Sequence, residues 1–241
     1  MTENEGGIAV SLNQSDLLFL RRSLPFWGRL SERERKLVES SAALRVHPAG
    51  SSLHNGAADC TGLFVVKSGQ VRTFILSDTG REITLFRLFE RDICIFSASC
   101  MLKNIRFDVF IEAVENSETI LVPTAVYNDL NQSSLAVSDY TNQLLSSRFS
   151  DVVWLLEQIL FMSFDRRLAL FLLEESAING GDRLPTTHEE IAKNMGTARE
   201  VVTRMLRYFH SEGLVALSRG EIRILDRKKL EALSAQAHGS P

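Results

Sequence analysis

The sequence contains few cysteines, no long apolar run and no basic leader. Three of its 241 residues are cysteines, Cys60, Cys94 and Cys100, which are too few to suggest a disulfide framework. No segment approaches the roughly 18 to 20 apolar residues that a membrane-spanning helix requires. The polar, acidic start of the chain, residues 1–7, lacks the cationic and apolar parts of a signal peptide. We therefore expect a cytoplasmic protein without a membrane partner.

The chain also has no overall excess of basic charge. Its formal net charge is -3, so total charge gives no argument for nucleic-acid binding, and local charge has to be examined instead. Hydrophobic residues make up 44% and charged residues 24% of the chain, which are ordinary values for a globular protein. A chain of 241 residues is long enough for two modest domains with real cores.

Short β-branched and aromatic segments follow one another between Val46 and Pro123. Residues 63–66, 71–76 and 83–88 are examples, and turn residues such as Ser68-Gly69 separate them. Strands of this length at a spacing of about ten residues are typical of a small β-sandwich or barrel.

Residues 134–163 contain neither proline nor glycine and predict one long helix. Apolar residues recur along it at the a and d spacing of a coiled coil, interrupted at Arg148. These residues are Leu145, Val152, Leu155, Ile159 and Met162. A helix of about 30 residues spans roughly 45 Å, which is too long to bury both flanks within a small β-domain. We favour the seam of a homodimer, and a helix packed along its own domain is the alternative.

The stretch from Thr187 to Asp226 carries the most informative pattern. Thr187 and Glu190 form a capping box that opens a helix, and Gly196 lies where that helix must end and turn. A second helix follows, with an apolar stripe on one side. Its polar side presents Arg199, Glu200, Thr203, Arg204 and Arg207. This order is typical of a helix-turn-helix.

Residues 214–225 then predict a β-hairpin that carries Arg219 and Arg223. Between Arg199 and Lys229 the chain has eight Lys or Arg residues and four Asp or Glu residues. For charge alone, a solvated helix face would explain this excess. Together with the helix-turn-helix and the hairpin wing, it predicts a surface that contacts DNA phosphates.

These motifs resemble those of the CRP/FNR family, named after the cyclic-AMP receptor protein and the fumarate-nitrate reductase regulator. Residues 189–192 and 196–204 resemble the family's helix-turn-helix, and residues 164–169 resemble the start of its DNA-binding domain. Gly50, Gly56, Gly69 and Gly80 fall at turn spacings similar to those of its β-roll. The resemblance covers about residues 26–233.

The resemblance implies an α+β fold with three parts. They are a cyclic-nucleotide-binding-type β-roll over residues 1–133, a dimerisation helix over 134–164 and a winged helix-turn-helix over 165–241. It further implies a transcription regulator, not an enzyme, that binds a palindromic site in double-stranded DNA, with RNA polymerase as a partner if it activates.

In that family the arginines and the glutamate of the recognition helix read base edges. The resemblance therefore implies base contacts for Arg199, Glu200 and Arg204, with Thr203 as a candidate fourth. Arg donates in a fork to guanine, and Glu accepts from cytosine, so the chemistry agrees. The other expected DNA contacts are Thr187, Arg207, Arg219 and Arg223. A cyclic-nucleotide or small-molecule binding module without direct DNA readout is the alternative function.

The effector is not identified by the resemblance. In nucleotide-binding members an Arg-Ser pair holds the cyclic phosphate, and here Phe107 and Asp108 align with that pair. Because Asp108 would repel a phosphate, we expect no binding of cyclic AMP, unless a shift of one place brings Arg106 to the phosphate.

The cysteines leave two readings open. Thiolates are soft ligands for iron–sulfur and zinc sites, so Cys94 and Cys100, with Cys60 as a third, are candidates for a metal or redox effector site. Alternatively they only pack, as free cysteines often do, and the N-terminal cysteine cluster of iron–sulfur members is absent. His47 and His54 would suit a cupin-like metal enzyme, but they have no third histidine or suitably spaced carboxylate. We therefore expect no metal and no catalytic site there.

Overall fold

A computed structural model describes residues 8–56, 60–101 and 108–235 of the chain. It divides into two compact units, the first formed by Met1–Thr79 and Thr84–Ser150 and the second by Gly80–Ile83 and Asp151–Pro241. Helix α4 (Leu135–Phe161) has 27 residues, yet neither it nor any other described helix combines the length and the hydropathy that spanning a bilayer requires.

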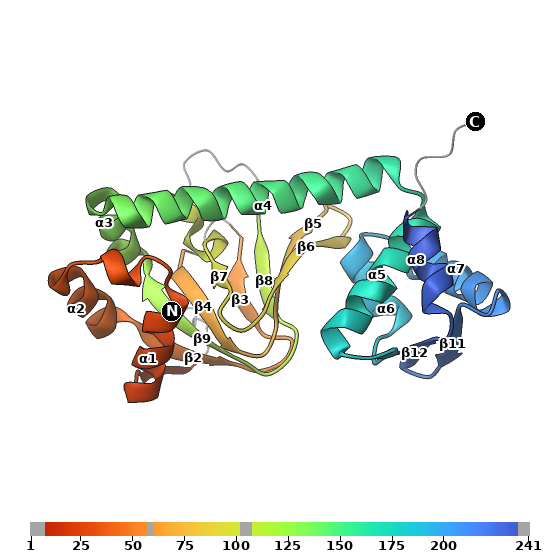
Figure 1. Cartoon of the computed structure of the whole chain (residues 1–241), viewed down its shortest axis with the longest axis horizontal. Helices are drawn as coiled ribbons and strands as arrows, with labels where there is room; N and C mark the ends of the chain where they lie inside the picture. Colours follow the sequence, from red (N-terminus) through yellow and green to blue (C-terminus); the bar gives the residue numbers. More distant parts are fainter. Residues whose placement is uncertain (1–7, 57–59, 102–107, 236–241) are drawn as a thin grey trace. The chain divides into compact units, whose positions relative to one another are not determined.

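The first unit contains two antiparallel sheets (Figure 1). The five-stranded sheet has the order β1 (Ile8–Ser11), β2 (Ala43–His47), β9 (Ser117–Pro123), β4 (Gly62–Ser68), β7 (Ile93–Cys94). The four-stranded sheet has the order β3 (Ser52–Asn55), β8 (Phe110–Ala113), β5 (Val71–Leu76), β6 (Glu82–Leu88). The predicted β-rich fold of this region is therefore confirmed.

The core of the first unit is built by apolar residues of these strands. Leu63 and Val65 of β4, Ile111 of β8 and Ile120 of β9 are all fully buried in one cluster. Between β4 and β5 the chain turns at Gly69, whose φ is +82°. A Cβ there would come within 2.6 Å of the Asn116 carbonyl oxygen, so the turn requires glycine.

Helices flank the sheets of the first unit. Three helices lie between β1 and β2 in the chain. They are α1 (Gln14–Ser23), the 3₁₀ helix η1 (Trp27–Arg29) and α2 (Glu32–Ser41). The capping box of α2 pairs Ser31 with Glu34, as their spacing predicts. Later in the chain come η2 (Phe96–Met101), α3 (Thr124–Ser133) and α4.

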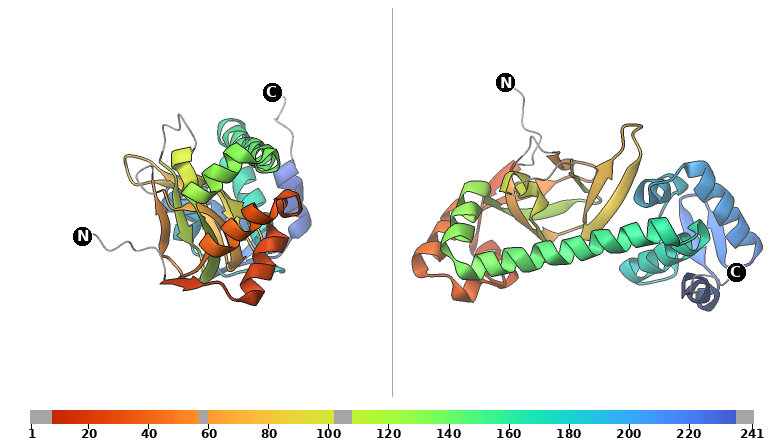
Figure 2. Two further views of the ribbon diagram at one scale, coloured as in Figure 1. Left: turned by 90° about the vertical axis from the view of Figure 1, so that its left-hand side faces the viewer. Right: turned by 90° about the horizontal axis from the view of Figure 1, so that it is seen from above.

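The long helix predicted over residues 134–163 is confirmed as α4. Figure 1 and the right-hand view of Figure 2 show it as one unbroken helix. Its first half buries Val137, Thr141 and Leu144 in the first unit, and the Thr141 hydroxyl lies 2.6 Å from the Tyr127 hydroxyl. Its second half leaves many apolar side chains exposed.

The second unit is a small helical domain with a three-stranded sheet in the order β10-β12-β11. Its elements are α5 (Phe164–Asn179), β10 (Arg183–Leu184), α6 (His188–Met195), α7 (Arg199–Ser211), β11 (Val215–Ser218), β12 (Glu221–Ile224) and α8 (Arg227–Ala235). Leu168 and Leu172 of α5 pack in one cluster with Val202, Leu206 and Phe209 of α7, and all five are fully buried. This core fixes the position of α7 relative to the helices around it.

Candidate nucleic-acid interface

The start of α6 and the turn after it follow from local sequence. The Thr187 hydroxyl accepts a hydrogen bond from the Glu190 N–H at 3.2 Å, and the Glu190 carboxylate accepts from the Thr187 N–H at 2.6 Å. At the other end Gly196 has a φ of +65° and donates its N–H to the Ala192 carbonyl. A helix that begins and ends at fixed residues, followed by a glycine turn, directs the chain into α7.

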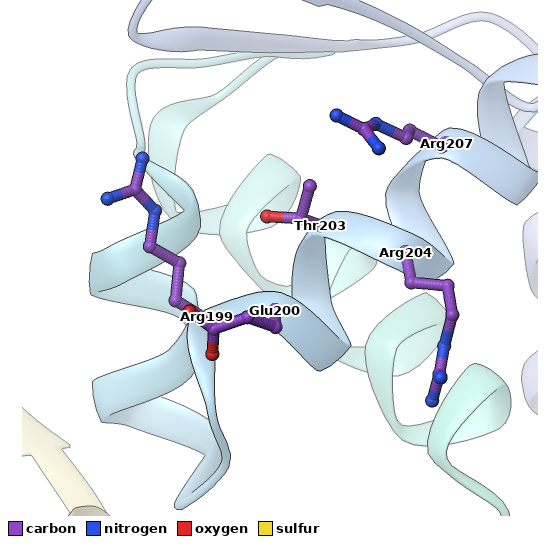
Figure 3. Close-up of a pocket in the computed structure, with 5 residues that line it drawn as sticks. All are labelled: Arg199, Glu200, Thr203, Arg204 and Arg207. Carbon is purple, nitrogen blue, oxygen red and sulfur yellow. The ribbon is translucent and has the colours of Figure 1, made fainter.

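Helix α7 turns its polar side away from the core and presents a shallow hollow of about 450 Å³. The hollow is lined by Arg199, Glu200, Thr203, Arg204 and Arg207 (Figure 3). Arg199, Thr203 and Arg207 form one row at a spacing of four residues, and Glu200 and Arg204 form a second row. In Figure 3 the Arg204 side chain extends to the opposite side of the helix from Arg199 and Arg207.

The arginines of this hollow have no acidic partner within the described ranges. None of Arg199, Arg204 and Arg207 forms an ion pair there, although Glu200 stands four residues before Arg204. All three are exposed. A guanidinium group carries five N–H donors and no acceptor, so these side chains are available to an anion or to a base edge.

The predicted hairpin is formed by β11 and β12, which pair from Val215 with Ile224 to Ser218 with Glu221. Ile222 and Ile224 are buried, so Arg223 between them points outward and is exposed. Arg219 is exposed in the two-residue turn. A second hollow of about 430 Å³ lies between this hairpin and the first turns of α6 and α7. It is lined by Thr186, Thr187, His188, Glu189, Arg199, Ser218, Gly220 and Ile222.

His188 is a residue of this surface that sequence reasoning missed. Its Nδ1 lies 2.9 Å from the Thr203 Oγ1, which links the first turn of α6 to the middle of α7. Burial, and then the positive charges of Arg199 and Arg207, lower the pKa of His188 below its usual value. The only sequence signal was its place directly after the Thr187 cap, because the contact depends on how the two helices cross.

The candidate effector residues of the first unit are only partly described. Cys94 is buried in β7, and burial raises the pKa of its thiol, so it is a protonated core residue at neutral pH. Cys60 is held in a disulfide, which the sequence did not suggest, because spacing along the chain does not show which cysteines approach. The Cys100 side chain and Arg106 with Phe107 lie outside the description, while Asp108 is exposed.

His47 lies on β2 of the five-stranded sheet and His54 on β3 of the four-stranded sheet. The His47 Nε2 lies 2.9 Å from the Thr119 hydroxyl, and burial, with a smaller effect of Arg45, lowers its pKa to about 4. His54 is fully buried on β3. In the part of the chain that the structure describes, no three His, Cys, Asp or Glu residues are placed to hold a metal ion.

The predicted seam residues lie along α4 and its end, with differing exposure. Leu145 packs against the core of the first unit, Val152, Leu155 and Met162 are half-buried, and Ile159 is 40% exposed. The most exposed apolar side chains of the stretch lie beside them. They are Phe149, Val153, Trp154, Leu156, Leu160 and Phe161.

Comparison with known proteins agrees with this geometry. Residues 166–233 match the model of the Crp-like helix-turn-helix domain. The crystal structure of a Crp/Fnr-family protein from Eubacterium rectale is 50% identical, with a TM-score of 0.87, and the match covers 89% of this chain and 100% of that chain. The Cyclic AMP receptor protein of Thermus thermophilus is 27% identical over 87% of this chain and 96% of its own length.

A further relative is the Transcriptional activator protein FnrA of Stutzerimonas stutzeri, which is 28% identical over 78% of this chain and 79% of its own length. These relatives are regulators, not enzymes. Their similarity to this chain extends beyond residues 189–204 and includes both units. The chain belongs to the CRP/FNR family of transcription regulators and carries that family's helix-turn-helix DNA-binding domain.

Proposed function

We propose that the protein is a cytoplasmic homodimer that binds a palindromic operator and responds to a signal at its β-roll. The observation that carries this proposal is the exposed hollow on α7, whose arginines have no acidic partner within the described residues. We assign residues 1–133 to the effector domain, 134–164 to the dimer helix and 165–241 to DNA binding. RNA polymerase is a further partner if the protein activates transcription.

Helix α7 enters the major groove with this hollow against the bases. Arg199 and Arg204 each donate in a fork to guanine, Glu200 accepts from cytosine, and Thr203 makes a fourth base contact. Arg207, the Thr187 cap and the hairpin residues Arg219 and Arg223 contact phosphates, which fix the register of α7 along the groove. The second hollow, between α6 and the hairpin, receives the DNA backbone.

The dimer forms along the second half of α4. Phe149, Val153, Leu156 and Leu160 repeat at spacings of four, three and four, and their exposed fractions range from 44% to 70%. This row lies beside the predicted row of Val152, Leu155 and Ile159, one residue around the helix. An apolar stripe of this period is buried when a second copy of the same helix packs against it. A two-fold axis through the seam would set the two copies of α7 about one turn of DNA apart, roughly 34 Å.

We exclude cyclic AMP as the effector, because Asp108 aligns where a phosphate would need a cation. The signal at the β-roll is another effector or a redox change. The buried, protonated Cys94 favours packing over sensing for that residue.

Binding-site selection from random duplex DNA, followed by a salt titration, tests the proposal. We expect an inverted repeat with half-sites one helical turn apart. Affinity for it should fall roughly 10³- to 10⁵-fold between 50 and 200 mM salt, if the dimer neutralises about six to ten phosphates. Equal affinity for all duplexes, or a flat response to salt, would contradict it.

A further inference from the structure

Thr203 occupies the centre of the row formed with Arg199 and Arg207, and it lines the hollow on α7 (Figure 3). A threonine within a helix commonly donates its hydroxyl to the carbonyl four residues earlier, as Thr141 does to Val137 at 2.8 Å. Thr203 does not follow that pattern. Its one side-chain hydrogen bond within the described residues joins its Oγ1 to the His188 Nδ1 at 2.9 Å.

We infer that His188 is a positioning residue that decides whether the Thr203 hydroxyl donates to a DNA base or accepts from one. This inference rests on the proposed function, because it concerns the same recognition helix. The geometry supports it in two ways: the ring reaches Thr203 from another helix, and the same ring lines the hollow between α6 and the hairpin.

The chemistry follows from the donors and acceptors on the two groups. A hydroxyl has one hydrogen to donate and two lone pairs that accept hydrogen bonds. In the neutral ring with its hydrogen on Nε2, Nδ1 accepts, so Thr203 spends its hydrogen on His188 and offers only lone pairs to the DNA, which suits adenine N6 or cytosine N4. When the ring is protonated, Nδ1–H donates to Thr203, and the threonine hydrogen is free for guanine O6 or N7 or for thymine O4.

The charged groups around the ring set when each state is populated. Arg199 and Arg207 face it from α7, and Glu189 lines the same hollow from its own helix. The hairpin contributes Ser218, Gly220 and Ile222, none of which is charged. The two guanidinium groups favour the neutral ring in the free protein, whereas DNA phosphates near the hollow would favour the protonated ring. Base preference at this position should therefore depend on pH.

Binding-site selection with the full-length wild type, His188→Ala, Thr203→Val and the double variant tests the inference at about pH 8. We expect Thr203→Val to reduce discrimination at one base pair of each half-site by roughly three- to tenfold, the worth of one hydrogen bond. His188→Ala should relax the same base pair and no other, and the double variant should lose no more than either single variant. His188→Asn, whose amide can stand near the position of Nδ1, should restore part of the preference.

A second arm repeats the selection with the wild type at about pH 5.5. The preferred base at that position should shift toward those that present an acceptor, and Thr203→Val should show no shift. Unchanged discrimination at this base pair in His188→Ala, or effects of the two substitutions that simply add, would overturn the inference alone. A wild type that selects no sequence would overturn the proposed function as well. Thermal unfolding of each variant checks that the fold is retained.

Discussion

The charged side chains around Asp16 in the first unit and those on α7 in the second unit are placed in opposite ways. In the first unit, Asp16 is fully buried and pairs with Lys67 at 2.8 Å, and Lys67 also pairs with Glu118 at 2.8 Å. On α7 of the second unit, Arg199 and Arg204 are exposed and form no ion pair within the described ranges. Paired charges in the first unit hold elements of the fold together. The unpaired charges on α7 form no ion pair that ties elements together, and they leave a surface that fits an anionic partner.

The Arg72 side chain shows the same contrast. It is 5% exposed, lies 3.4 Å from the Glu112 carboxylate and stacks over the Phe74 ring with its guanidinium carbon 4.2 Å from the centroid. An arginine held in this way cannot reach a ligand in solution, whereas Arg204 can. Burial and pairing, more than residue type, therefore distinguish structural from functional arginines in this chain.

The largest effect should come from breaking the dimer, which would separate the two copies of α7. Leu156→Glu places a charge in the seam, where it would be buried without a partner, so the protein should be monomeric at micromolar concentration. Operator affinity should fall by more than about 100-fold, because one half-site is lost. Analytical ultracentrifugation and a DNA-binding titration measure both effects.

The matched control for the seam is Glu157→Ala, the next residue on α4, which changes an exposed side chain outside the two apolar rows. It should leave the protein dimeric. If Leu156→Glu is also still dimeric, the seam assignment is wrong.

Removing one unpaired arginine should have the next largest effect. Arg204→Ala removes a forked donor to a base, so binding should weaken by about 1 to 3 kcal/mol per half-site, with relaxed preference at one base pair. Arg223→Ala, on the hairpin, should weaken binding to all sequences about equally and reduce the salt slope by about one unit. Equal and small losses of DNA affinity in both variants would indicate that the polar face of α7 is only solvated and does not contact DNA. Fluorescence anisotropy over a salt series distinguishes these cases.

Removing a paired charge should affect the first unit alone. Asp16→Ala deletes the buried carboxylate that accepts from Lys67 and from the Asn13 N–H, and it should lower the free energy of unfolding by about 2 kcal/mol. Lys67 keeps Glu118, which limits the loss. Base preference should not change. Asp129→Ala, an exposed position on α3, is the matched control and should cost little.

The same pair gives a dependence on pH. Burial opposes ionisation of Asp16, but the hydrogen bonds from Lys67 and Asn13 outweigh it and lower the pKa of the carboxyl below its ordinary value of 3.8. A lowered folded-state pKa contributes stability above the unfolded-state value, and that stability is lost as pH falls through the folded value. Acid unfolding below about pH 4 should therefore be less steep in Asp16→Ala. An identical slope in the wild type and the variant would contradict this assignment.

The sequence predicted best what local residues decide. The capping boxes at Ser31 and Thr187 and the turn at Gly196 need only neighbouring residues, and the helices that they delimit form as expected. Short β-branched and aromatic segments, separated by turn residues, likewise predicted a β-rich first unit. The predicted fold class and the resemblance to the family both rest on these local features.

Contacts between distant segments could not be predicted in this way. The His188–Thr203 hydrogen bond depends on the crossing of α6 and α7, and the disulfide at Cys60 depends on which cysteines approach in the fold. Periodicity predicted an apolar stripe on α4 but not its direction. Two adjacent rows share the same spacing, and the burial of Val137 and Leu144, with Leu145 packed against the same core, shows which side the first unit covers.

The most direct test of the central claim, that α7 reads bases with its unpaired arginines, replaces guanine by 7-deazaguanine in the selected operator. The substitution removes the N7 acceptor of a forked arginine contact and leaves the phosphates unchanged. Affinity of the wild type and of Arg204→Ala would be measured on both operators. The account predicts that one guanine of each half-site loses its importance in Arg204→Ala, so that the two changes together cost no more than Arg204→Ala alone. Losses that add fully at every guanine would contradict a base contact by Arg204.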